Sequence, residues 1–153
     1  MINNMETIMK PFKILILLFS FFTTSVLATD LTIYKSPYCG CCTAWAEQVE
    51  EAGFKVTVVE QENNNQLRKL HSVSPELTSC HTVIVEGYAI EGHVPVQDIK
   101  RLLREKPVLA GLAVPGMPAS SPGMDVPGNS DPYQVIAFTK EGKKTVYNQY
   151  NMK

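Results

Sequence analysis

The sequence lacks a basic stripe, an internal repeat and an apolar run long enough to cross a bilayer comfortably. Its 153 residues carry 14 Lys and Arg against 15 Asp and Glu, so a nucleic-acid partner is not expected. The apolar run Ile14 to Phe22 has nine residues, with Ser20 as its one polar member. A membrane-spanning helix needs about 20 apolar residues.

The first residues instead have the pattern of a secretory signal peptide. Lys10 and Lys13 precede the apolar run, and Val26-Leu27-Ala28 resembles a cleavage site. We therefore predict a signal peptide over 1–28, a single domain over 29–153, a periplasmic location, and no membrane span after cleavage. An uncleaved N-terminal anchor is the alternative.

The predicted mature part has no strong charge. Only Glu6 and the two lysines of the charged region lie before residue 29, so the formal charge of the mature part is −2. Its length is sufficient for one domain with a real core.

Three of the four cysteines lie within four residues, at Cys39, Cys41 and Cys42. Export normally means an oxidising compartment, where cysteines form structural disulfides. Structural disulfides stabilise more when they close longer loops, and this cluster closes almost none. A helix N-terminus favours thiolate, the form that attacks disulfides and binds soft metals. The cluster therefore indicates reactive or metal-binding cysteines rather than structural disulfides.

Hydrophobic periodicity and turn residues predict the secondary structure. Leu67 and Leu70 are expected to point inward from a short helix that Asn63 to Asn65 can cap. The region 111–132 is rich in Pro and Gly, and we predict an ordered loop that lies over the domain. The expected elements are a strand at 31–35, a helix at 43–52, a strand at 55–59, a helix at 66–71, a hairpin at 83–91, a helix at 96–105 and a hairpin at 133–150.

This order predicts an α/β, thioredoxin-like fold (β-α-β-α-β-β-α) with an added Gly/Pro/Met-rich loop and a C-terminal β-hairpin. Cys39-x-x-Cys42 lies between the first strand and the first helix, which is the position of the redox motif in that fold. The residue that enters the third strand lies beside this motif in thioredoxin-like folds. Here Cys80 and His81 occupy that position without the usual proline. We therefore expect two distant segments to meet at one site.

Several short motifs spread along the chain match those of a known family. They are Lys35 to Cys42, Ser79 to Thr82, Glu91 to Pro95, Gly116 to Pro118 and Ser121 to Met124. With these motifs the chain resembles the DUF411 family of secreted bacterial metal-binding proteins, which includes copper-resistance proteins of the CopG kind. The resemblance implies a thioredoxin-like fold, a periplasmic location and copper handling.

Thiolates with thioether and imidazole groups suit Cu(I), and zinc is the alternative because it accepts three Cys and one His. Cys39 and Cys42 are expected to face one metal ion, whereas Cys41 should point elsewhere unless the turn is distorted or several ions are bound. Both methionines lie in the loop and are either ligands or core residues. The candidate metal ligands are Cys39, Cys41, Cys42, Cys80, His81, His93, Met117 and Met124.

These features predict a periplasmic Cu(I)-binding protein that contributes to copper tolerance by sequestration, redox handling or transfer. Because thiolates bridge readily, a multi-copper cluster is one hypothesis. The expected partners are copper ions and a periplasmic copper chaperone or efflux component. The alternative is a thiol–disulfide oxidoreductase that uses Cys39 and Cys42. Copper-linked redox turnover stays open.

Overall fold

The computed structural model describes residues 28–152, and the predicted signal peptide lies outside the described residues except for its last residue, Ala28. No helix within 28–152 is long and apolar enough to cross a membrane. The elements in chain order are β1 (Asp30–Lys35), α1 (Gly40–Glu51), β2 (Lys55–Glu60), α2 (Asn65–Leu70), the short 3-10 helix η1 (Pro75–Leu77), β3 (His81–Val85), β4 (Tyr88–Glu91), α3 (Val96–Glu105), β5 (Gly111–Ala113), β6 (Tyr133–Phe138) and β7 (Lys144–Tyr150).

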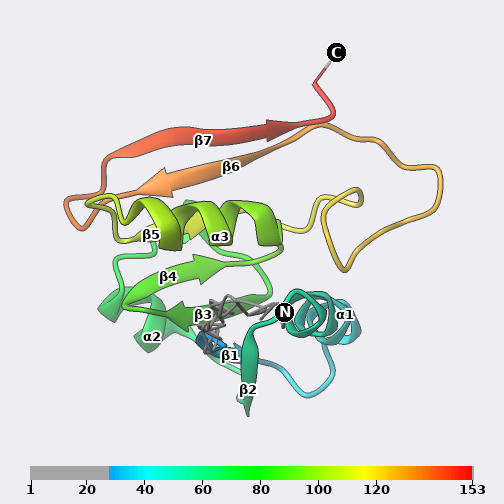
Figure 1. The fold of residues 1–153 in the computed structure, drawn as a ribbon, viewed down its shortest axis with the longest axis horizontal. Coiled ribbons are helices and arrows are strands. Elements are labelled where there is room, and N and C mark those ends of the chain that lie inside the picture. The colour runs from blue at the N-terminus through cyan, green and yellow to red at the C-terminus, as the bar shows by residue number, and fades with distance from the viewer. Residues whose placement is uncertain (1–27, 153) are drawn as a thin grey trace, which may run out of the picture.

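The strands form one mixed sheet in the order β2-β1-β3-β4-β5-β6-β7, which Figure 1 shows from bottom to top. β1 pairs parallel with β2 and antiparallel with β3, and β3 and β4 form the predicted hairpin. β5 pairs parallel with β4 and antiparallel with β6. β6 pairs antiparallel with β7, and these two strands form the predicted C-terminal hairpin at the end of the strand order. The described part is thus a mixed α/β fold.

Alternation along the strands creates two apolar faces. Val83 and Val85 of β3 belong to the main core, which α1 and α3 cover through buried residues such as Trp45 and Leu102. Ile84, between the two valines, packs on the opposite face with a smaller cluster that includes Leu77 of η1. This period of two is expected of a sheet that is buried on both faces.

Three details differ from the sequence predictions. β5 was missed, because three small or apolar residues show no alternation. α1 begins at Gly40 rather than at Thr43, so two cysteines belong to the helix itself. Leu70 is 78% exposed and does not point inward, because α2 is only six residues long and buries no residue completely.

Candidate metal centre

Three cysteines surround the N-terminus of α1. Cys39 precedes the helix with an extended backbone (φ −86°, ψ 93°), and its carbonyl accepts a hydrogen bond from the Thr43 N–H at 3.3 Å. Cys41 and Cys42 lie in the first helical turn, where free N–H groups and the helix dipole favour negative charge.

Cys39 and Cys42 form a disulfide, whereas Cys41 and Cys80 are free thiols. A disulfide sulfur is not a thiolate, so this pair can hold a soft metal only after a two-electron reduction. The predicted sharing of one metal ion by Cys39 and Cys42 therefore concerns the reduced protein.

Cys41 is expected to point elsewhere unless the turn is distorted or several ions are bound, and the turn at Cys39 is the exception, because its backbone is extended rather than helical. The Sγ of Cys41 lies 3.5 Å from the Sγ of Cys39. The expectation placed Cys39 and Cys41 on one helical wheel, on which two residues differ by about 200°. Cys39 lies before the helix with an extended backbone, so the wheel does not describe it.

Cys80 completes the sulfur group from a distant segment. It lies just before β3, and the four cysteine sulfur atoms are within 4.8 Å of one another. Cys80 also forms a second group with His81 and His93, whose donor atoms meet the same limit. Cys80 is the residue that these two groups share. The two segments that the sequence predicted to meet do lie together.

The contact between Cys80 and His93 defines the state of the His93 ring. The Nδ1 of His93 lies 2.8 Å from the carbonyl oxygen of Pro122, which can only accept a hydrogen bond. Nδ1 therefore carries the proton, and Nε2 presents its lone pair to the Cys80 Sγ at 2.9 Å. A backbone carbonyl that orients a histidine in this way is a common feature of metal sites.

His81 is fully buried between two other rings. Its ring centre lies 4.7 Å from that of Trp45 and 5.0 Å from that of His93. Burial and, to a smaller extent, the neighbouring His93 together lower the pKa of His81 to about 3. Its Nδ1 lies 3.5 Å from the Cys80 Sγ, and its Nε2 has no hydrogen-bond partner. His81 is therefore a neutral imidazole, the form that binds metals.

The electrostatic environment of the two remaining donors differs from that at the helix. Burial also lowers the pKa of His93. Burial raises the pKa of Cys80 to about 11, and the neighbouring Cys41 thiol contributes to the increase. The Cys80 thiol is therefore protonated at neutral pH, and a metal ion that binds there must displace its proton.

The loop between β5 and β6 forms the outer wall of the site, on the same side of the molecule as α1 (Figure 1). Its Gly116 N–H donates to the Thr78 carbonyl at 3.1 Å, close to Cys80 in sequence. The side chain of Asp125 accepts a hydrogen bond from Gln48 of α1 at 2.7 Å. The predicted ordered loop over the domain is present at 114–132, because 111–113 form β5. The orienting role of the Pro122 carbonyl is the feature that sequence reasoning missed.

The two methionines occupy different environments in this loop. Met117 is 57% exposed, so it is not a core residue. Met124 is half-buried and follows Gly123, which lies directly against the Cys41 carbonyl. Their roles as copper ligands stay predictions.

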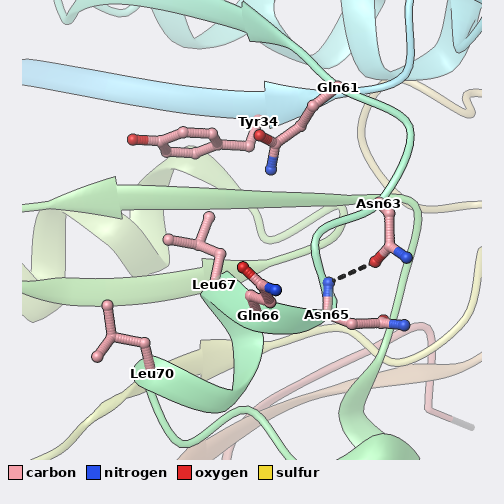
Figure 2. Close-up of a pocket in the computed structure, with 7 residues that line it drawn as sticks. All are labelled: Tyr34, Gln61, Asn63, Asn65, Gln66, Leu67 and Leu70. Atoms are coloured by element: carbon pink, nitrogen blue, oxygen red, sulfur yellow. Dashed lines mark hydrogen bonds between the residues drawn. The ribbon is translucent and has the colours of Figure 1, made fainter.

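A separate cleft of about 550 Å³ lies between β1 and α2, and its lining contains no thiol, thioether or imidazole. Figure 2 shows Tyr34 and Gln61 on one side of this space and Leu67 and Gln66 below them. The cleft is therefore distinct from the thiol site.

The contact between the loop and α1 can be tested by replacing Gly123 with alanine. Gly123 has φ +80°, and a Cβ there would lie 2.7 Å from the Trp45 backbone nitrogen. Left-handed backbone strain and overlap with fixed backbone atoms should together lower the free energy of unfolding by roughly 2–5 kcal/mol. Urea denaturation measures this loss.

Gly128→Ala is the matched control, because Gly128 also has a positive φ (+76°) but open space around it. We expect this control to lose only the strain energy of about 1–2 kcal/mol. Equal losses in the two variants would mean that the loop is not packed against α1.

A seven-stranded α/β fold with clustered thiols and two neutral histidines defines a protein with a candidate soft-metal centre. Residues 77–124 match the family described as "Protein of unknown function, DUF411". The chain belongs to this DUF411 copper-resistance family, because two solved structures of copper resistance proteins are 38% identical to it over 81% of its length.

Two structures, titled copper resistance protein CopG, forms 1 and 2, are similar to the chain over nearly their whole length. Each is 38% identical to it, with a TM-score of 0.77. The similarity covers 81% of this chain, and 98% and 99% of the two CopG chains. No curated protein matches the sequence of this chain.

Proposed function

We propose that this protein binds copper as Cu(I) in the periplasm and contributes to copper tolerance by sequestration, redox handling or transfer. The observation that carries the proposal is the meeting of four cysteine sulfurs and two histidine nitrogens at Cys80. Such a soft donor set suits Cu(I), and zinc is the weaker candidate. The similarity to copper resistance protein CopG supports copper over zinc.

The arrangement of the thiols supports binding of more than one ion. Four thiolates within 4.8 Å can bridge metal ions once the Cys39–Cys42 disulfide is reduced. We therefore propose a thiolate-bridged copper cluster, flanked by His81 and His93. Met117 and Met124 in the loop are proposed as additional thioether ligands, and a copper chaperone or efflux component as the delivery partner.

We further propose that the domain is a thioredoxin-like variant. Three features support this: the strand order β2-β1-β3-β4, the cysteine motif between β1 and α1, and the β3–β4 hairpin followed by α3. The Cys39–Cys42 disulfide favours a second candidate function, thiol–disulfide exchange, because that bond joins the two ends of a Cys-x-x-Cys motif.

Anaerobic titration of the reduced protein with Cu(I) tests the copper proposal. Ultraviolet absorption from thiolate-to-copper charge transfer should increase until at least one ion is bound per chain, and a ratio of about four would favour the cluster. Four free thiols should be recovered after the copper is removed. No bound copper, together with rapid exchange of the Cys39–Cys42 disulfide with an added dithiol, would support the oxidoreductase instead.

A further inference from the structure

Cys80 lies in an irregular segment that needs support from outside. It is placed between η1 and β3, and no regular backbone hydrogen bonds of a helix or strand hold Ser79 or Cys80. A ligand on such a segment keeps a defined geometry only if neighbouring groups fix its backbone.

An ion pair holds both sides of Ser79, the residue before Cys80. The Ser79 N–H donates to Glu91 Oε1 at 2.8 Å. The Ser79 carbonyl, which belongs to the peptide bond with Cys80, accepts a hydrogen bond from Arg68 Nη2 at 2.8 Å. The same Arg68 nitrogen lies 2.8 Å from Glu91 Oε1. Arg68 and Glu91 therefore grip the backbone that leads into Cys80.

The pair is buried and its hydrogen bonds are satisfied. The Glu91 side chain is 0% exposed and that of Arg68 is 13% exposed. Glu91 Oε2 accepts a further hydrogen bond from Thr82 Oγ1 at 2.6 Å. A buried ion pair is weak grounds for a stabilising role, because apolar residues of similar size are often equally stable. The pair instead orients the backbone, because the hydrogen bonds of both residues to Ser79 hold the peptide segment that leads into Cys80.

Glu91 also links the two strands that bring Cys80 and His93 together. It is the last residue of β4, two positions before His93, whose Nε2 contacts the Cys80 Sγ at 2.9 Å. One carboxylate thus fixes the segment of Cys80 relative to the segment of His93.

We propose that Arg68 and Glu91 are positioning residues that set the place of the Cys80 sulfur within the metal centre, without binding metal themselves. The copper part of this inference rests on the proposed function. Without the pair, the fold persists but Cys80 leaves its defined position beside Cys41 and His93.

The double variant Arg68→Met/Glu91→Leu tests the inference, because it removes the grip without leaving an unpaired buried charge. In the form with the Cys39–Cys42 disulfide intact, Cys41 and Cys80 are the two free thiols. Iodoacetamide labelling and mass spectrometry then report the reaction rate of each thiol separately. We expect the Cys80 rate to increase at least about 10-fold and the Cys41 rate to stay unchanged. In the reduced form, Cu(I) affinity should decrease by about 10–100-fold.

The matched control is Arg101→Met/Glu105→Leu in α3. Arg101 and Glu105 form an exposed ion pair, in which Arg101 Nε lies 3.3 Å from Glu105 Oε1. This control should behave as the wild type in both assays. A merely structural role would instead raise the Cys41 and Cys80 rates together by general unfolding. Arg68→Lys, which keeps the charge but loses the planar fork, replaces the double variant if that does not fold. It should show the same selective change at Cys80.

The proposal is overturned if a folded variant keeps the wild-type Cys80 rate, or if the wild type binds Cu(I) and a folded variant binds it equally tightly. Failure of the proposed function is a separate result, in which the wild type and the control also bind no Cu(I). The labelling rates then still decide whether Arg68 and Glu91 position Cys80.

Discussion

Replacing Cys80 by serine is expected to lower the Cu(I) affinity of the reduced protein by more than about 100-fold. Mutating a group that only orients a ligand typically lowers metal affinity by about 10–100-fold, and the loss of a ligand should exceed this. A hydroxyl oxygen is a poor ligand for a soft ion. Cys80 is the shared member of both donor groups, so its loss leaves three sulfurs on one side and two imidazoles on the other. Competition with a Cu(I) chelator measures the affinity.

Cys41→Ser is the informative comparison. Cys41 belongs to the sulfur group alone, so its loss leaves Cys80, His81 and His93 intact. We expect a smaller decrease in affinity than for Cys80→Ser, and little change in melting temperature for either variant because serine is nearly isosteric. If Cys41→Ser binds copper less tightly than Cys80→Ser does, Cys80 is not the shared ligand.

Reduction of the Cys39–Cys42 disulfide is expected to produce the second large effect, an increase in the number of Cu(I) ions bound. The oxidised protein offers two thiols, and the reduced protein offers four. Cu(I) titration of both forms under anaerobic conditions gives the two stoichiometries. Reduced protein that has been alkylated at all thiols is the control and should bind no Cu(I).

The same reduction should change stability only modestly. The disulfide spans a sequence separation of three, and chain entropy for so short a loop contributes about 2 kcal/mol. A large gain in copper capacity with a small loss in melting temperature would indicate that Cys39 and Cys42 serve copper binding rather than the stability of the fold. Equal copper binding by the two forms would exclude Cys39 and Cys42 as ligands.

Local patterns predicted most of the elements. The apolar spacing of α3, the β-branched run of β2 and the Glu86-Gly87 turn each determine structure through neighbouring residues, and all three are found in the structure. β5 escaped because Gly111 to Ala113 form a strand only through their partners in β4 and β6. A three-residue strand has too little sequence to show a period.

The sequence predicted that the cysteine motif and the segment of Cys80 lie together, but not the geometry of their contacts. The position of Cys80 beside the cysteine motif followed from the order of elements. The contact of Cys80 with His93 depends on how the β3–β4 hairpin ends, and the tautomer of His93 depends on the Pro122 carbonyl, 29 positions away. Such contacts are set by tertiary packing, and no sequence period encodes them.

β5 has a consequence for how disturbances spread through the molecule. It has three residues, yet it joins β4 to β6 within one hydrogen-bonded sheet. The loop that walls the thiol site therefore leaves the sheet at one strand and returns to it at the neighbouring strand. We therefore expect the C-terminal hairpin and the site to unfold as one cooperative unit. Weakening the pairing of β6 and β7 should therefore also destabilise the loop beside the thiols, although no residue of that hairpin is among the candidate ligands.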